Sequence, residues 1–153
     1  MRLIHVCAIG LLVGCGAEMN PPPPLAPAQR EAIKQNLVKL GARVTADVPE
    51  GLYLSLRNTH VEIRELGGVV DGSRRTRNDV LDFCSVNEAV VRAFLTGDEF
   101  EAFRRWQRES LYPKPPSVPR AEYGDLKLTL SRAPLRIVFS RKPPSADGSP
   151  TPP

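Results

Sequence analysis

The sequence predicts an α+β fold: a small antiparallel sheet of two hairpins, with an N-terminal helix and a helical pair inserted between the hairpins. Residues 52–63 and 126–139 alternate apolar and polar side chains, as strands with one buried face do. Residues 27–41 and 85–111 instead repeat their apolar side chains at helical intervals. The presence of both periodicities in one short chain predicts helices packed on the apolar face of one sheet.

The first helix is expected over residues 27–41. Pro27 suits its first turn, where a backbone N–H is not needed, and Gly41 suits its C-terminal stop. This helix opens a single folded domain that we expect over residues 28–141. The apolar face of the helix consists of Ile33, Leu37 and Leu40.

Three short alternating stretches follow the helix and predict half-buried antiparallel strands. They are ARVTADV (42–48), LYLSLR (52–57) and HVEIREL (60–66). Residues 67–78, GGVVDGSRRTRN, contain three glycines and three arginines and are expected to form an exposed loop. The residues expected to face the core are Val44, Ala46, Val48, Leu52, Leu54, Leu56, Val61 and Ile63.

A helical pair is expected between residues 85 and 111. Ser85 and Glu88 fit a capping box that would begin its first helix, and Gly97 would end it. Asp98 would cap the second helix, whose aromatic residues Phe100, Phe103 and Trp106 are expected to be core rather than a binding platform.

Residues 125–141 show the clearest hairpin pattern of the chain. Leu126, Leu128 and Leu130 alternate with polar residues, and a turn then leads into a second alternating strand. The similarity to residues 51–63 leaves two alternatives open: a duplicated hairpin, or two amphipathic hairpins that merely look alike. In either case we expect four or five strands in all.

The first fifteen residues have the features of an export signal. A positive charge at Arg2 precedes an apolar stretch that is too short for a stable membrane span and that ends in small residues. The four residues from Leu12 to Cys15, LVGC, resemble the lipobox of bacterial lipoproteins at every position. The resemblance implies that residues 1–14 are removed, that the Cys15 thiol carries diacylglycerol, and that the new amino end is acylated. Several acyl chains hold a protein on a membrane stably.

The same resemblance implies a location in the bacterial cell envelope, with the domain facing the periplasm or exposed at the surface. Gly16 stands where an aspartate would favour the inner membrane, so the outer membrane is slightly favoured. Residues 15–27 form a proline-rich tether that could hold the domain up to ~40 Å from the lipid. Residues 142–153, KPPSADGSPTPP, are expected to be a disordered tail because they contain little that can be buried.

The composition limits the classes of function. The formal net charge is +4 at pH 7 and falls to +3 when Arg2 leaves with the signal, which is too little to indicate a nucleic-acid binder. With Cys15 lipidated, Cys84 has no partner for a disulfide, so stability must come from a packed core. The chain shows no glycine-rich phosphate loop, no Gly-x-Ser-x-Gly elbow and no metal-type spacing of cysteine or histidine, and we expect no metal and no cofactor.

His60 and Glu62 are the weak candidates for catalysis. They lie two residues apart on an expected strand and therefore share a face, so they could form a general base with its orienting partner or serve as two metal ligands, although either use needs a further group that the sequence does not name. The alternative is a solvent-facing polar surface. Cys84 could be activated by a nearby helix start and paired with His60, or it could be a buried, unreactive thiol.

Two arginine clusters could bind phosphate or another anion. The first, Arg74, Arg75 and Arg77, is the stronger candidate because few acidic residues surround it. The second lies on a helix among acidic residues and is expected to be a solvated face; it consists of Arg104, Arg105 and Arg108.

Three functions remain open from the sequence. The leading one is a non-enzymatic envelope lipoprotein that serves as a binding, assembly or accessory subunit for another envelope protein. The second is a small lipidated effector, toxin or hydrolase that uses His60, Glu62 and the arginine loop. The third is an adaptor that binds anionic envelope polymers through the first arginine cluster.

Overall fold

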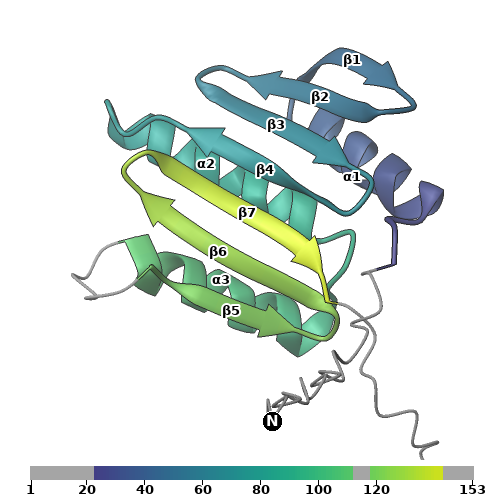
Figure 1. Ribbon diagram of the computed structural model, residues 1–153. Helices are drawn as coiled ribbons and strands as arrows, with labels where there is room; N and C mark the ends of the chain where they lie inside the picture. Colours follow the sequence, from purple (N-terminus) through teal and green to yellow (C-terminus); the bar gives the residue numbers. More distant parts are fainter. Residues whose placement is uncertain (1–22, 112–117, 143–153) are drawn as a thin grey trace, which may run out of the picture.

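The computed structural model describes residues 23–111 and 118–142 (Figure 1). The expected signal, Cys15, the first part of the tether and most of the tail lie outside these residues. None of the helices in the described ranges is long and apolar enough to cross a membrane.

The fold is a seven-stranded antiparallel sheet with three helices on one face (Figure 1). The spatial order of the strands is β1-β2-β3-β4-β7-β6-β5. The α+β class, the N-terminal helix and the helical pair between two sets of hairpins are therefore confirmed, with more strands than expected. In chain order the elements are α1 (Pro27–Lys39), β1 (Arg43–Val48), β2 (Gly51–Leu56), β3 (Thr59–Arg64), β4 (Gly67–Gly72), α2 (Arg77–Val91), α3 (Gly97–Leu111), β5 (Arg120–Tyr123), β6 (Leu126–Arg132) and β7 (Leu135–Arg141).

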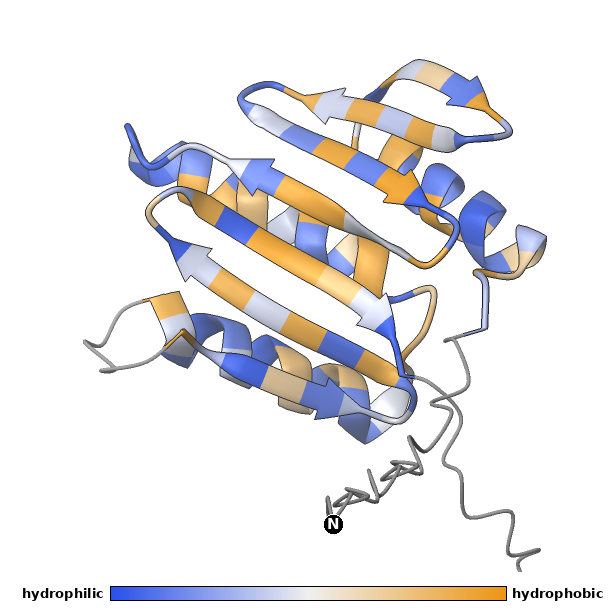
Figure 2. Cartoon of the chain, in the orientation of Figure 1, coloured by the Kyte–Doolittle hydropathy of each residue, from blue (hydrophilic) through white to orange (hydrophobic). Residues whose placement is uncertain are grey.

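The core lies between the sheet and the helices. In β2, β3, β6 and β7 the alternating apolar residues point to the helices, and Figure 2 shows this alternation along each strand. Helix α1 contacts β1 and β2, α2 contacts β3 and β4, and α3 contacts β5. The largest fully buried side chains are Phe83, Phe103, Phe139, Ile33, Leu37, Leu52, Leu54, Ile63, Leu126, Leu128, Leu130 and Ile137.

Three expectations about the N-terminal part are wrong. Leu40 is exposed, because α1 ends at Lys39 and Leu40 is only the residue that caps it. Val48 is also exposed, since a register shift between Val44 and Ala46 breaks the alternation of β1 and places Ala46 opposite the outward-facing Tyr53, so that Ala46 does not face the core as expected either. The edge strand therefore presents less apolar surface to the core than its sequence indicates.

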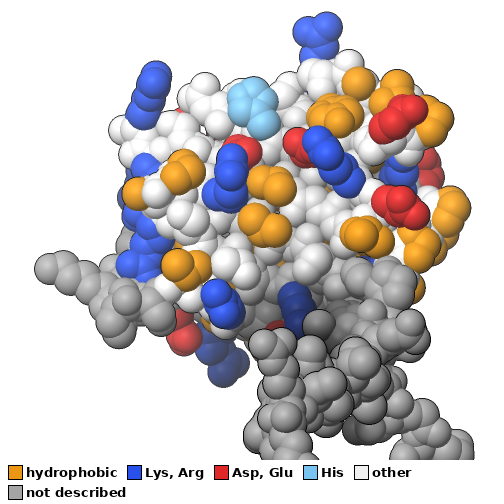
Figure 3. Space-filling view, viewed as in Figure 1, with side chains coloured by type: hydrophobic (Ala, Val, Ile, Leu, Met, Phe, Trp, Pro, Cys, Tyr) orange, Lys and Arg blue, Asp and Glu red, His pale blue; other side chains and the backbone are white. Residues whose placement is uncertain are grey.

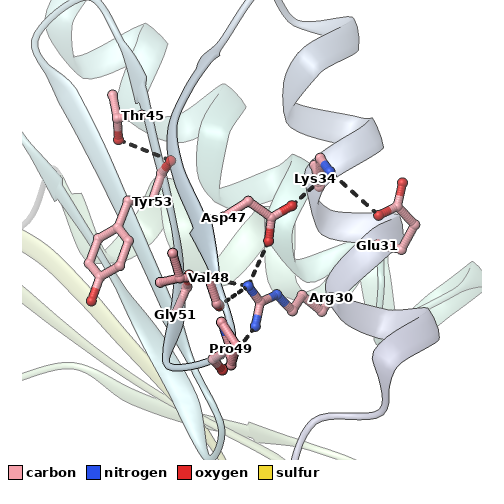
Figure 4. Close-up of polar contacts among 9 residues, drawn as sticks. All are labelled: Arg30, Glu31, Lys34, Thr45, Asp47, Val48, Pro49, Gly51 and Tyr53. Atoms are coloured by element: carbon pink, nitrogen blue, oxygen red, sulfur yellow. Dashed lines mark hydrogen bonds and ion pairs between the residues drawn. The ribbon is translucent and has the colours of Figure 1, made fainter.

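Polar contacts fasten α1 to the β1–β2 hairpin (Figure 4). Arg30 donates to the Asp47 carboxylate at 2.6 Å and to the backbone oxygen of Gly51 at 3.1 Å, while Lys34 donates to Asp47 at 2.7 Å. The hydrogen bonds from Lys34 and Arg30 lower the pKa of the Asp47 carboxyl. The Thr45 hydroxyl donates to the backbone oxygen of Tyr53 at 3.0 Å and so joins the two strands of the hairpin.

The expected exposed loop over residues 67–78 is wrong in its first half, which forms strand β4. Its glycines are needed for packing on the helix side: a Cβ at Gly68 would lie 2.5 Å from the Phe139 ring, and one at Gly72 would lie 2.5 Å from the Phe83 ring. Glycine in a strand interior often marks such a close approach. β4 pairs with both β3 and β7 and joins the two halves of the sheet.

The helical pair begins earlier than expected. α2 begins at Arg77, and its capping box is formed by Thr76 and Asp79, not by Ser85 and Glu88, which lie inside the helix. Thr76 accepts from the backbone N–H of Asp79 at 3.1 Å, and Asp79 accepts from the N–H of Thr76 at 2.9 Å. Gly97 begins α3 and does not end the preceding helix, which stops at Val91.

Candidate functional site

No described helix covers the second face of the sheet, and we call it the open face (Figure 1). The register places its side chains in rows that cross the strands. The central row contains a polar, aromatic end and an apolar middle at the junction of β4 and β7. From β2 to β5 this row consists of Tyr53, Glu62, Val69, Val138, Thr129 and Arg120.

A second row runs beside the first and is mostly polar. It consists of Ser55, His60, Asp71, Arg136 and Ser131. Arg136 donates to Asp71 across the β4–β7 junction, with one of the two hydrogen bonds at 3.1 Å. The Asp71 carboxylate raises the pKa of Arg136. This ion pair closes one side of the apolar middle.

The apolar middle is a shallow hollow of about 380 Å³ on the open face. Leu66 and Val138 are exposed by 45% and 40% of their surface, which is high for branched aliphatic side chains. Figure 3 shows apolar side chains on this face with charged groups around them. The hollow is lined by Glu62, Arg64, Leu66, Gly67, Gly68, Val69, Val138, Phe139 and Ser140.

The structure places His60 and Glu62 on the open face, as neighbours across a smaller hollow of about 160 Å³ that Asp71 also lines. The Glu62 carboxylate accepts a hydrogen bond from Arg64, and no hydrogen bond joins it to His60. The hollow is thus lined by one imidazole and two carboxylates, and each carboxylate is paired with an arginine. Within residues 23–111 and 118–142, no three histidine, cysteine or acidic side chains are grouped as metal ligands.

Cys84 lies in α2, on the other side of the sheet from His60 (Figure 1). Its side chain is half-buried and packs against the core. Burial raises the pKa of the thiol to about 11, and the nearby Glu88 carboxylate acts in the same direction. The histidine–cysteine pair considered from the sequence is therefore not formed by these residues.

The first arginine cluster lies at one end of the sheet, between β4 and α2. Arg74 donates to the backbone oxygens of Leu111 and Arg132 at 3.4 and 3.5 Å. Arg75 and Arg77 are exposed and form no side-chain hydrogen bond or ion pair with the described part of the chain. The three arginines are thus brought together, but not next to His60 and Glu62.

The second arginine cluster is a solvated helix face. Arg104 is close to Glu88 and Glu101, which both raise its pKa. Arg105 and Arg108 are exposed. The aromatic residues beside them are largely core: Phe100 and Phe103 are buried, and Trp106 is half-buried.

The residues that the sequence reasoning missed are those in the middle of the open face. Val69 and Asp71 lie in β4, which was expected to be a loop, and Arg136 and Val138 are the outward residues of β7. The alternation of β7 predicts that Arg136 and Val138 face away from the core, but only the pairing of β4 with β7 shows what they lie beside.

Comparisons with protein-family models, curated proteins and solved structures gave no match to this chain.

Proposed function

We propose that the protein is a lipid-anchored bacterial envelope protein that acts as a non-enzymatic binding, assembly or accessory subunit, and that its open face holds a protein partner. The single observation that carries the binding role is the hollow around Val69 and Val138, an apolar area exposed in the middle of a charged sheet surface. Apolar centres with polar rims are typical of protein interfaces.

The size of the open face fits this role. Seven strands about 4.8 Å apart and about six residues long, at about 3.3 Å per residue, span roughly 30 by 20 Å, or about 600 Å² of flat area. A standard protein interface buries about 800 Å² of each partner, which a side-chain surface of this flat area can supply. The ion pairs around the hollow would form the rim, with Arg64–Glu62 on one side and Arg136–Asp71 on the other.

The membrane anchor is supported by the LVGC motif and by the place at which the chain enters the domain. The backbone N–H of Leu25 donates to the backbone oxygen of Glu65 at 2.7 Å, and the Arg141 side chain donates to the backbone oxygen of Pro24 at 3.2 Å. The last residues of the tether are thus fastened beside the β3–β4 turn. A lipid at Cys15 would hold the domain by that end and leave the open face accessible from the side.

The anchor is tested by expressing the gene in a bacterial host and weighing the mature protein. We expect cleavage before Cys15, the added mass of diacylglycerol and an acyl chain, and recovery in the membrane fraction. The Cys15→Ser variant should keep the leader mass and lose the acyl mass. A wild-type product without acyl mass, or one found in the aqueous fraction, would overturn the anchor.

The binding role is tested by placing a photo-crosslinking amino acid at Val138 in cells of the native host. We expect one discrete adduct with a protein, which disappears when Val69, directly opposite on β4, is changed to lysine. Leu81 is the matched control because it is also an exposed branched aliphatic residue, but lies in helix α2. The same adduct from position 81, or none from position 138, would contradict the proposal.

The second candidate, a lipidated effector or hydrolase, is favoured by the hollow that His60, Glu62 and Asp71 share. Replacement of His60 by alanine distinguishes the two candidates because this exposed side chain contributes little to folding. The readout is whether the His60→Ala variant can replace the wild-type protein in cells of the native host. A variant that still folds and still gives the Val138 adduct, but cannot replace the wild-type protein, would support the enzyme. A variant that replaces it fully would support the binding role.

A further inference from the structure

The two ends of the sheet differ in charge, because acidic and basic side chains are paired at one end and arginines predominate at the other. Three turns lie at the end where the tether enters, and each contributes one acidic residue: Glu50 between β1 and β2, Glu65 between β3 and β4, and Asp125 between β5 and β6. The other end contains the β2–β3, β4–α2 and β6–β7 connections. We call it the arginine-rich end, and it consists of Arg57, Arg74, Arg75, Arg77 and Arg132.

We propose that the arginine-rich end binds an anionic glycan, through the phosphate or carboxylate groups that such a polymer presents at close intervals. Figure 3 shows basic side chains gathered at this end, whereas acidic and basic side chains lie together towards the other. Guanidinium groups pair with both kinds of oxyanion through two parallel hydrogen bonds. This proposal rests on the proposed envelope location, which supplies the class of ligand.

The arginines at this end divide into two that hold the fold and three that are available to a ligand. Arg132 donates to the backbone carbonyl oxygen of Ser110 at 2.7 Å, and Arg74 donates to that of Leu111 at 3.4 Å, so both lie against the C-terminus of α3, where positive charge is favourable. The available ones are Arg57, Arg75 and Arg77.

The acidic residues near this end neutralise it only in part. Asp79 is buried and is occupied by hydrogen bonds from Asn58 and Thr76. Asp82 accepts two hydrogen bonds, at 2.8 and 2.9 Å, from a single nitrogen of Arg57. The Arg57 side chain is still 70% exposed, so its remaining donors can reach a ligand.

Backbone conformation at Arg57 supports a role beyond folding. Its φ of 50° is in the left-handed region, and among the described residues no other non-glycine residue has a positive φ. An L-residue in this conformation costs about 1–2 kcal/mol, which glycine would avoid. The two-residue hairpin turn itself requires a positive φ at a central residue, for which glycine or asparagine is usual, so the arginine at its tip is not the residue that the turn favours.

The position of the arginine-rich end relative to the tether also favours a glycan as its ligand over the membrane that anchors the protein. Since the tether enters at the end that carries Glu65, the arginine-rich end lies at the opposite end of the strands from that entry point. The described residues place no exposed aromatic side chain there for base stacking, which single-stranded nucleic acid usually requires. An extended anionic glycan needs only the oxyanion contacts.

The test uses the full-length protein in a mild detergent, with polygalacturonate as the carboxylate probe and inorganic polyphosphate as the phosphate probe. We expect binding to both at 50 mM salt. The triple change Arg57→Gln, Arg75→Gln and Arg77→Gln should weaken binding at least 10-fold and lower the slope of log K against log salt by about 2. The matched control removes the same charge elsewhere, at Lys39, Arg105 and Lys127, and should change affinity less than 3-fold.

Two further variants keep the proposal testable if the triple variant folds poorly. Arg75→Gln with Arg77→Gln breaks no hydrogen bond among the described residues and should lower affinity several-fold. Arg57→Gly removes the charge together with the backbone strain, so it should bind more weakly while unfolding at a temperature equal to or above that of the wild type. If Arg57 served only to stabilise the fold, the Arg57→Gly variant would instead unfold at a lower temperature than the wild type.

Three results would overturn the proposal: no binding of either probe at low salt, equal losses in the triple variant and its control, or binding to anionic vesicles or single-stranded DNA that neither probe displaces. Because the assay is done in detergent solution, failure of the lipid anchor would not affect it. Mass analysis of Cys15 reports on the anchor, and probe affinity reports on the arginine-rich end, so the two failures are distinguishable.

Discussion

Gly72 ends β4 directly against helix α2, and replacing it with alanine tests the contact on which the arginine-rich end is built. The added Cβ would lie 2.5 Å from Cδ2 and 3.0 Å from Cγ of Phe83. Phe83 is completely buried, so its ring cannot turn into solvent. Carbon atoms normally stay about 3.5–4.0 Å apart, so strand or helix must move by roughly 1 Å.

Overpacking of this kind costs about 1–3 kcal/mol in the free energy of unfolding. For a domain of this size, a loss of about 2 kcal/mol lowers Tm by roughly 8 °C. Urea unfolding followed by circular dichroism measures the free energy directly, and an unchanged m value would show that the denatured state is unaffected.

The contact is isolated by repeating the change in a Phe83→Leu background. There we expect Gly72→Ala to cost at least about 1 kcal/mol less, because leucine lacks the part of the ring that the Cβ meets. Gly41→Ala is the control: Gly41 has a φ of 91° and no atom within 4 Å of its added Cβ, so its cost comes from backbone strain and should be equal in both backgrounds. Additive costs for Gly72 and Phe83 would refute the packing of β4 on α2.

Three further predictions concern helix α2. Thr76→Ala should lower the free energy of unfolding by about 1 kcal/mol and Thr76→Ser by only a few tenths, since serine keeps the N-cap oxygen; urea unfolding measures both. The hydrogen bond from the Asn58 amide, followed by those from Thr76, lowers the pKa of Asp79, so this carboxylate stabilises the folded state above about pH 4 and the contribution is lost as the pH falls through the folded pKa. The stability difference between wild type and Asp79→Asn should therefore narrow as the pH falls below about 4, and a difference that is constant with pH would contradict this prediction. With a pKa of about 11, the Cys84 thiol should react slowly with a disulfide reagent at pH 8 in the native protein and quickly in denaturant. The measurement uses a Cys7→Ser, Cys15→Ser protein, in which Cys84 is the one remaining thiol. Fast labelling of the native protein would show that the core does not shield this thiol.

The two hairpins could be predicted from the sequence because their alternation is set by burial on one face. Leu52, Leu54 and Ile63 in the first hairpin, and Leu128 and Phe139 in the second, are all buried as expected. Nothing in their tertiary surroundings competes with the local pattern. The same holds for helix α1, which begins at Pro27 and lacks any competing start.

The start of α2 could not be predicted because two capping boxes compete locally. Ser85 with Glu88 has the serine–glutamate pattern, whereas Thr76 with Asp79 has a less common one. The structure uses Thr76 because Asp79 also accepts a hydrogen bond from Asn58 at 3.0 Å, in the β2–β3 turn. That contact spans 21 residues of sequence, and no local window contains it.

Strand β5 was missed for a different reason. Arg120–Tyr123 contains four residues, directly after a proline-rich segment, and only Ala121 and Tyr123 turn towards the core. So short a stretch shows too few alternations to be distinguished from a loop. Its strand conformation depends on pairing with β6, which holds it at the edge of the sheet.

The candidate sites depended on β4 more than on any other element. In an antiparallel sheet successive turns alternate between its two ends, so each strand that is added or omitted moves all later connections to the opposite end. If residues 67–78 were one loop after β3, Arg74 and its neighbours would begin at the end with Glu65, beside the tether. Because Gly67–Gly72 is a strand of six residues, it carries these arginines roughly 20 Å to the other end, next to Arg57.

The same strand places Val69 opposite Val138 and Asp71 opposite Arg136. Misreading one glycine-rich strand therefore hides both the apolar hollow of the open face and the arginine-rich end, although every residue that forms them is visible in the sequence.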